Sequence, residues 1–288
     1  MERHLLVTVS EQMSALHGGR FVGSFFENKA PVKLTLFYTV QKPAAVWAGE
    51  KTDELVREQE ELTRKYAERG SRALQEAKKE MLHLGFPEES IELKLQGRML
   101  SKTKDILEEA ARGLYDAVVL GRRGLNWFEE AFDGSVTKEI MEKIHPCPIW
   151  ICRRPQEGRK GVLLCMDGSE ASFRMADHVG FILGKDQPHP VKILVVKGQS
   201  LHASPDAIIE KGEELLRKGG VPNIRVTASA IKASSPLKAI EREAQKGGYA
   251  AVAVGRAAQK SLTDRVFFGS VSMGLFRRIE HAALWVTI

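Results

Sequence analysis

The sequence predicts an α/β protein built from two repeats, each a five-stranded parallel sheet sandwiched by helices. The first observation is length, because 288 residues exceed one domain of roughly 150 residues. The second is composition, with 43% hydrophobic and 28% charged residues, which is typical of globular proteins. The third is the alternation of short apolar runs with longer helical patterns. Strands that are apolar throughout, such as 117–120, indicate a parallel sheet covered on both faces.

Two pairs of matching segments indicate that the chain repeats itself. The run 116–122 returns as 250–256, and Gly255 lies 134 residues after Gly121. The tripeptide that starts at Gly134 returns at Gly269, 135 residues later. Solenoid repeats have periods of only about 20–50 residues, so this spacing indicates a duplicated domain. The charged stretch 153–160, which contains Pro and Gly, marks the join, and we predict domains 1–154 and 160–288.

In the first half, each apolar run is short enough for a strand, and the segments between the runs are long enough for helices. The helix expected over 53–84 is amphipathic, with Leu55, Leu62, Tyr66 and Leu74 on a charged background. We expect the other helices of this half near 11–27, 102–114 and 135–145, and its strands at 4–9, 32–40, 90–96, 116–121 and 147–152.

The second half follows the same order of elements. Ser204-Pro205 and Ser235-Pro236 each predict a helix start, because Ser caps a helix and Pro is favoured at its first position. We expect the strands of this half at 161–166, 191–197, 223–231, 249–254 and 283–288.

The charge distribution argues against a nucleic-acid-binding protein. The formal net charge is +6. Residues 1–155 hold 24 Lys+Arg against 24 Asp+Glu, so the excess of 19 over 13 belongs to residues 156–288. Lysines and arginines alternate with acids along the predicted helices, which is typical of solvated faces and not of a stripe that follows a phosphate backbone. We therefore expect no nucleic-acid partner.

Cysteine usage and hydropathy bear on the compartment. The three cysteines, Cys147, Cys152 and Cys165, form no C-x-x-C pair and lie in or beside apolar runs. They are typical of buried thiols in a reducing compartment. No apolar run approaches the ~18 residues of a membrane span, and the N-terminus does not read as a signal peptide. We expect a soluble cytoplasmic protein with no membrane partner.

The end of the fourth strand carries the segment that points to a ligand. Gly121-Arg122-Arg123-Gly124 is followed by nine residues and then by Gly134-Ser135-Val136-Thr137. The glycines let the backbone approach a ligand closely, and the free N–H groups at the start of the next helix favour phosphate. In open α/β sheets, ligands bind beyond the carboxyl ends of the strands, where the strand order reverses. The segment matches neither a Walker loop nor a Rossmann fingerprint, yet its chemistry suits a nucleotide.

This G-x2-G-x9-G-[S/T] pattern, followed by a Cys-Pro-hydrophobic strand, resembles the universal stress protein family, and the resemblance covers both halves. It implies an adenine nucleotide alpha hydrolase-like, Rossmann-like fold, a stress-response role and, for the family's ATP-binding branch, ATP or a related adenine nucleotide as ligand. It also implies pairing through the last strands, with the duplicate supplying the partner about a pseudo-twofold axis. The residues that it implies for the first half are Val40 on the adenine side and Gly121, Arg122, Gly124, Gly134, Ser135, Val136 and Thr137 around the phosphates and ribose.

Each half departs from the family pattern in one place. In the first half Ser10 stands where the family has an Asp after the first strand. In the second half Asp167 and Val196 match, but Ala258 replaces the middle glycine of the loop and the spacing to the next glycine is one residue longer. We therefore expect the nucleotide in the first half. The second half offers a weaker site, formed by Asp167, Val196, Gly255, Gly269 and Ser270.

Plainer structural roles remain open for the same residues. Gly121 and Gly255 could simply end strands, and Gly134 and Gly269 could be turn glycines. Asp167 could cap the helix that begins at Ser169. The alternative function is then an interaction or scaffold protein with degenerate sites, which binds no nucleotide. A homodimer and an unidentified protein partner are compatible with either reading.

Nothing in the sequence indicates strong catalysis. The eight histidines show neither metal-ligand spacing nor a nucleophile–base pairing, and Gly168-Ser169-Glu170 lacks the second glycine of a nucleophile elbow. The loop acids Glu129, Glu130 and Asp133 are the only general-base candidates near Gly134. We expect at most a slow ATPase, in which Ser135 or Thr137 could contact a magnesium ion. Trp150 and Trp285, at equivalent places in the two last strands, predict packing between the repeats.

Overall fold

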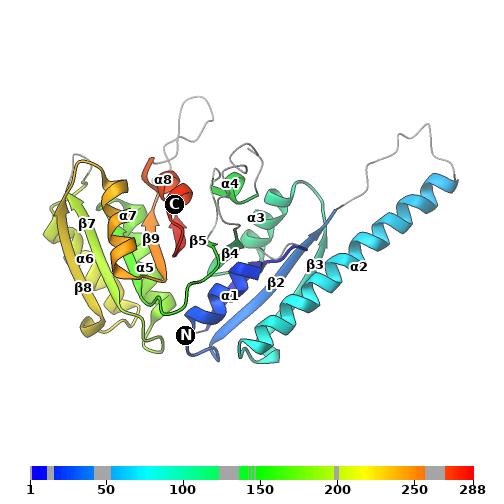
Figure 1. Cartoon of the computed structure of the whole chain (residues 1–288), viewed down its shortest axis with the longest axis horizontal. Coiled ribbons are helices and arrows are strands. Elements are labelled where there is room, and N and C mark those ends of the chain that lie inside the picture. The colour runs from blue at the N-terminus through cyan, green and yellow to red at the C-terminus, as the bar shows by residue number, and fades with distance from the viewer. Residues whose placement is uncertain are drawn as a thin grey trace.

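The computed structural model describes residues 2–11, 16–41, 53–122, 136–141, 143, 145, 147–197, 201–256 and 270–288. Within these ranges ten strands form one sheet, in the order β3-β2-β1-β4-β5-β10-β9-β6-β7-β8. Neighbouring strands are parallel except β5 and β10, which pair antiparallel at the centre. Figure 1 shows the two halves on either side of this central pair.

The strands are β1 (Arg3–Thr8), β2 (Val32–Val40), β3 (Ile91–Gly97), β4 (Ala117–Gly121), β5 (Ile149–Cys152), β6 (Val162–Met166), β7 (Val191–Lys197), β8 (Val226–Lys232), β9 (Ala251–Gly255) and β10 (Ala283–Thr287). The helices are α1 (Leu16–Phe25), α2 (Asp53–His83), α3 (Lys102–Arg112), α4 (Val136–Met141), α5 (Glu170–Leu183), α6 (Pro205–Lys218), α7 (Pro236–Gly247) and α8 (Ser270–Arg278). Two short 3-10 turns are η2 (Glu88–Ser90) and η4 (Asn223–Arg225).

Both halves have the same topology, which confirms the predicted duplication. Read outward from the centre, each half has its fifth strand, then its fourth, first, second and third. Helices α1, α2, α5 and α6 supply the hydrophobic core on one face of the sheet, and α3, α4, α7 and α8 supply the core on the other. Successive residues of a strand point to opposite faces, so Val118 lies in one core and Val119 in the other. This explains why the central strands are apolar at every position.

The predicted elements match the described ones, with small differences at the ends. The strand expected over 223–231 begins only at Val226, because η4 precedes it and Ile224, which extended the apolar run, is 93% exposed. The helix expected over 135–145 is described from Val136 to Met141. The predicted caps are confirmed, because Ser204 and Ser235 accept hydrogen bonds from the third residue beyond them.

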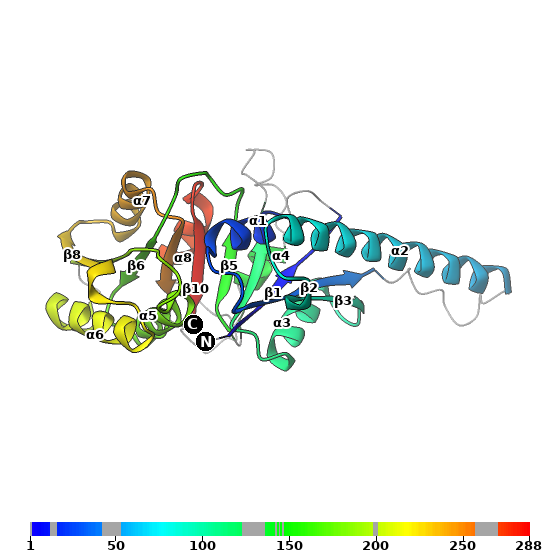
Figure 2. The ribbon, with the colours of Figure 1, turned by 90° about the horizontal axis from the view of Figure 1, so that it is seen from below.

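The two repeats are joined by the antiparallel pair of fifth strands, which confirms the predicted packing. Trp150 and Trp285 are directly opposite each other in the ladder. Their rings stack at a centroid distance of 4.1 Å with an interplanar angle of 5°, and both side chains are fully buried. Phe25 of α1 packs edge-on against both rings. Figure 2 shows β5 and β10 side by side between the two halves.

His178 of α5 ties the second repeat to a tryptophan of the first. The indole Nε1 of Trp150 donates a hydrogen bond of 3.0 Å to Nε2 of His178. Burial lowers the pKa of His178 to about 3, so the ring is neutral and Nε2 is free to accept. Protonation of Nε2 would place two N–H donors face to face and leave a charge in the apolar core.

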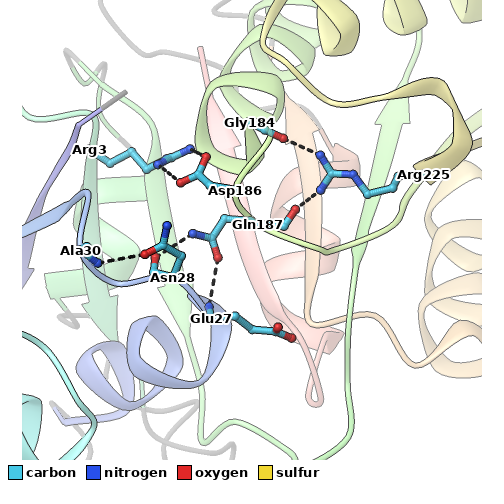
Figure 3. A network of polar contacts seen from close by, with 8 residues as sticks. All are labelled: Arg3, Glu27, Asn28, Ala30, Gly184, Asp186, Gln187 and Arg225. Carbon is cyan, nitrogen blue, oxygen red and sulfur yellow. Dashed lines mark hydrogen bonds and ion pairs between the residues drawn. The ribbon is translucent and has the colours of Figure 1, made fainter.

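A polar network reinforces the same junction (Figure 3). The buried guanidinium of Arg3 forms two hydrogen bonds with Asp186, of 2.7 and 2.8 Å. Burial opposes ionisation of Asp186 and is the largest single effect, but the hydrogen bonds and positive charge of Arg3, together with a backbone hydrogen bond and the charge of the N-terminus, lower the pKa of the carboxyl. The Gln187 amide accepts from the backbone N–H of Glu27 and donates to the backbone oxygen of Asn28. Every one of these contacts joins one repeat to the other.

In the described part of the chain, no helix is long and apolar enough to cross a membrane.

We expect the stability of the repeat junction to fall in mild acid because of His178. In the unfolded chain its pKa is near 6.5, so between pH 6.5 and about 3 the unfolded state binds the extra proton. The free energy of unfolding should therefore decrease as pH falls, by up to about 1.4 kcal/mol per pH unit. Urea titrations should show that the difference in the free energy of unfolding between the wild type and His178→Leu changes by about 2 kcal/mol between pH 7 and pH 5, because only the wild type loses stability through this histidine. Substitution of the exposed His83 by Leu serves as the control, and an equal change there would contradict the assignment.

Truncation of one of the stacked tryptophans should weaken the contact between the repeats and leave each five-stranded half folded. Trp285→Ala removes a fully buried ring that contacts Trp150 and Phe25, and we expect a loss of about 3–5 kcal/mol in the free energy of unfolding. Two separate unfolding transitions in calorimetry would show that the repeats have become independent. A loss below about 1 kcal/mol would contradict a central role for the stack.

Candidate functional site

The edge formed by the carboxyl ends of β1 and β4 is the candidate site in the first repeat. β1 pairs with β2 on one side and with β4 on the other, so the chain leaves these two neighbouring strands in opposite directions. Such a reversal of strand order is where open α/β sheets bind ligands. The second repeat has the same reversal between β6 and β9.

In the first repeat the start of α1 is held against the end of β4. Gly121 is the last residue of β4, and the N–H of Arg122 donates to the carbonyl of Cys152 at 2.8 Å. The carbonyl of Arg122 contacts Nδ1 of His17 at 3.0 Å. A Cβ at Gly18 would lie 3.3 Å from the backbone nitrogen of Gly121, so the absence of a side chain there allows the helix to lie close to the strand end.

The guanidinium of Arg122 is engaged with the other repeat. It donates to the carbonyl of Phe276 near the end of α8, and its central carbon lies 3.6 Å from the centroid of the Phe276 ring. The sequence predicted that Arg122 holds phosphate. In this structure its charged end instead contacts a helix C-terminus and an aromatic face, both of which attract cations.

Arg256 makes the reciprocal contact from the second repeat, and sequence reasoning did not single it out. Its guanidinium donates to the carbonyl of Met141, the last residue of α4, and, at 2.8 Å, to the carbonyl of Lys143 two residues further on. The side chain is only 1% exposed, and this burial lowers the pKa of Arg256 to about 10. The signal was present in the sequence, because both halves place Gly-Arg at the end of the fourth strand.

The predicted adenine-side residues lie at the ends of the second strands. Val40 and Val196 are buried, with 6% and 8% of their surface exposed, and the carbonyl of Val40 accepts a 2.8 Å hydrogen bond from the N–H of Arg98. Asp167 follows β6, and its Oδ1 accepts from both the N–H and the hydroxyl of Ser169, at 3.0 and 2.6 Å. Ser169, not Asp167, caps α5, so Asp167 positions the cap.

The central part of each predicted phosphate loop lies outside the described residues. Val136 and Thr137 begin α4, and Ser270 begins α8. The predicted residues outside the described ranges are Gly124, Gly134, Ser135 and Gly269.

Gly255 is required for packing in the second repeat. An added Cβ would lie 2.2 Å from the carbonyl carbon of Ala171 and from the nitrogen of Ser172, in the first turn of α5. No side chain fits at that distance, because both contacted atoms belong to the backbone. The close approach of a helix start to a strand end therefore accounts for this glycine with or without a ligand.

A cationic cleft opens beside the end of β5 in the first repeat. Its volume is about 440 Å³. Arg153, which lines it, is buried, and burial lowers the pKa of its guanidinium although Glu280 opposes this. The cleft adjoins His17 and therefore the end of β4. Its lining residues are His17, Arg153, Arg154, Pro155, Gln156, Glu280 and His281.

The fold and the strand reversals define a tandem, doubly wound α/β protein with one candidate ligand edge in each repeat. The family model for the universal stress protein family matches residues 1–153. The chain therefore belongs to the universal stress protein family. None of the curated proteins matches the sequence of this chain.

Solved structures agree with the tandem arrangement. A universal stress protein from Archaeoglobus fulgidus superimposes with a TM-score of 0.71 at 16% sequence identity, over 99% of this chain and 97% of that one. A functionally unknown protein from Pseudomonas aeruginosa superimposes with a TM-score of 0.56 at 15% identity, over 99% and 92% of the two chains. At these identities the likeness shows a shared fold.

We expect Gly255→Ala to destabilise the second repeat. The new Cβ would overlap the first turn of α5, and relief of that overlap should cost about 1–3 kcal/mol or more. Gly97→Ala is the matched control, because it also ends a strand and an added Cβ there meets nothing within 4 Å. Equal midpoints for the two variants in urea denaturation would show that the contact is not a constraint.

Proposed function

We propose that the protein is an adenine-nucleotide-binding regulator of a stress response, and that the first repeat holds ATP or a related nucleotide. The observation that carries the proposal is the strand reversal at β1 and β4, at which α/β sheets bind ligands. Gly121 ends β4 there, and the family's glycine and hydroxyl pattern follows it in the sequence.

In this proposal the backbone of the loop, and not the Arg122 guanidinium, contacts the phosphates. The Arg122 side chain is engaged with Phe276. The N–H groups at Gly134, Ser135 and Val136 would then be the phosphate ligands, with Gly121 and Gly124 keeping the loop near the ligand. Val40 would contact the adenine. Ser135 or Thr137 would contact magnesium if the nucleotide carries it.

We propose domain boundaries of 1–154 and 160–288 and a cytoplasmic location. The linker between the fifth strand of the first repeat and the first strand of the second supports the boundaries, because residues 153–161 contain no helix or strand. Cys147, Cys152 and Cys165 form no disulfide, which supports a reducing compartment.

The second candidate function is a scaffold that binds partners without a nucleotide. Two observations favour the scaffold function. Gly255 is needed for packing, and Arg122 and Arg256 form contacts between the repeats, so all three residues have structural roles that require no ligand. In the second repeat, the weaker site of Asp167, Val196, Gly255, Gly269 and Ser270 would then be inactive. Native mass spectrometry of protein purified from its host separates the two functions, since only the first predicts a co-purified adenine nucleotide.

Gly124→Val should abolish ATP binding measured by isothermal titration calorimetry and leave the circular dichroism spectrum unchanged. The branched side chain would occupy the space of the phosphates and disfavour positive φ. Ala258→Val is the matched control in the second repeat and should leave binding intact. Loss of binding in Ala258→Val with retention in Gly124→Val would assign the site to the other repeat.

A further inference from the structure

The cationic cleft beside the end of β5 lies between the two repeats, and none of the residues proposed for the nucleotide lines it. His17 reaches it from α1, and Arg153 and Arg154 reach it from the linker that follows β5. Glu280 and His281 reach it from the segment between α8 and β10. Its volume of about 440 Å³ is within the range of small-molecule pockets. Segments of both repeats therefore line one cleft that is large enough for a small ligand.

Arg153 brings a buried positive charge to this cleft. Only 8% of its surface is exposed, and burial lowers the pKa of its guanidinium. Among the described residues it has one hydrogen-bond partner, the carbonyl of Arg277 at 3.5 Å, and it forms no ion pair. That distance is long for a hydrogen bond, and a guanidinium has five N–H donors. A buried charge is costly without an anionic or hydrogen-bonding partner, so an anion in the cleft would stabilise Arg153.

A chain of hydrogen bonds determines which ring nitrogen of His281 carries the proton. Nε of Arg159 donates to Oε1 of Gln156 at 2.8 Å, so the amide nitrogen of Gln156 is the atom that lies 2.8 Å from Nδ1 of His281. Because an amide N–H donates, Nδ1 accepts, and the proton of the neutral ring is on Nε2. Nε2 lies 3.9 Å from Oε2 of Glu280, which is too far for a hydrogen bond. His281 therefore offers an N–H donor to a ligand in the cleft.

His17 connects the cleft to the end of β4. Its Nδ1 lies 3.0 Å from the carbonyl of Arg122. A carbonyl oxygen can only accept, so Nδ1 donates, and Nε2 is the ring nitrogen that remains for a ligand. Arg154 is exposed and adds a second guanidinium to the lining. Two arginines thus face a single carboxylate among the lining residues, that of Glu280.

We propose that this cleft binds a phosphate group, either free phosphate or the phosphate of a small metabolite, between the two repeats. The buried Arg153 and the exposed Arg154 would hold the anion, since guanidinium groups form paired, charge-assisted hydrogen bonds with phosphate oxygens. His281 would add a donor from the second repeat. Phosphate suits donors that come from separate segments better than a planar carboxylate does, because it offers three strong acceptor oxygens. The bound anion would connect α1 and the linker to the segment before β10.

Inorganic phosphate is the probe, titrated at pH 7 against sodium chloride of equal ionic strength, with the Tm as the readout. Phosphate should raise the Tm of the wild type, because a ligand that binds only the folded state stabilises it. Arg153→Gln should weaken the apparent affinity for phosphate at least about ten-fold, and Arg154→Gln about two- to five-fold. Arg277→Gln is the matched control and should keep the wild-type affinity, because Arg277 is an exposed arginine that does not line the cleft.

Glu280→Gln should have the opposite effect, which distinguishes binding from a general loss of stability. It removes the one carboxylate of the lining, so phosphate should bind about two- to five-fold more tightly. A damaged fold would not bind phosphate more tightly. Unchanged affinity in both Glu280→Gln and Arg153→Gln would overturn the proposal. Parallel titrations with glycerol 3-phosphate distinguish the two sources, because tighter binding of the ester indicates a metabolite and tighter binding of inorganic phosphate indicates the free ion.

Nuclear magnetic resonance of the histidine ring nitrogens locates the phosphate. Phosphate should shift the ring signals of His17 and His281 and leave those of the exposed His83 unchanged. Gly124→Val, which should lose ATP, should keep this response. If neither cleft histidine shifts, or if Gly124→Val abolishes the response, the cleft assignment is refuted while the proposed function stands. If both cleft histidines shift and no adenine nucleotide binds, the phosphate cleft stands and the proposed function fails.

Discussion

The antiparallel pairing of β5 with β10 is the constraint on which the rest of the molecule depends. It joins two five-stranded sheets into one, and it brings Trp150 and Trp285 into direct register. The stacked indoles are fully buried because α1 and α5 cover them from the same face. An edge strand is prone to pair with other chains. Duplication within one chain pairs the two edges with each other, without the loss of translational entropy that a dimer of separate subunits would incur.

The same pairing determines how the two candidate edges are built. Because the halves are related by a pseudo-twofold axis, the end of β4 lies near the end of α8, and the end of β9 lies near the end of α4. Arg122 and Arg256 use this proximity, since each donates to carbonyls at the helix end of the other repeat. A residue type that sequence reasoning links to phosphate therefore serves helix capping and repeat packing in this structure.

The two repeats have diverged in charge while they have kept one topology. The second retains the acid after its first strand, Asp167, and uses it to hold the cap of α5. In the first, Ser10 stands at the corresponding position. A shared fold thus presents edges of different electrostatic character. Such divergence is compatible with duplication, because one copy can change its ligand chemistry while the central pair continues to stabilise both.

The duplication, the order of strands and helices and the helix caps could all be predicted from the sequence. Local periodicity predicts the elements, Ser-Pro pairs predict the caps, and matching segments about 134 residues apart predict the duplication. The pairing of the two last strands was predicted from the resemblance to the universal stress protein family. The contacts of Arg122, Arg256 and Gly255 could not be predicted in this way, because their partners lie far away in the chain. The tertiary structure also brought Glu11 to the hydroxyl of Tyr38, because the neighbouring parallel strands β1 and β2 end at one edge of the sheet. The role of a side chain follows from its neighbours in space. For residues at the ends of strands, sequence spacing alone does not specify which residues these neighbours are.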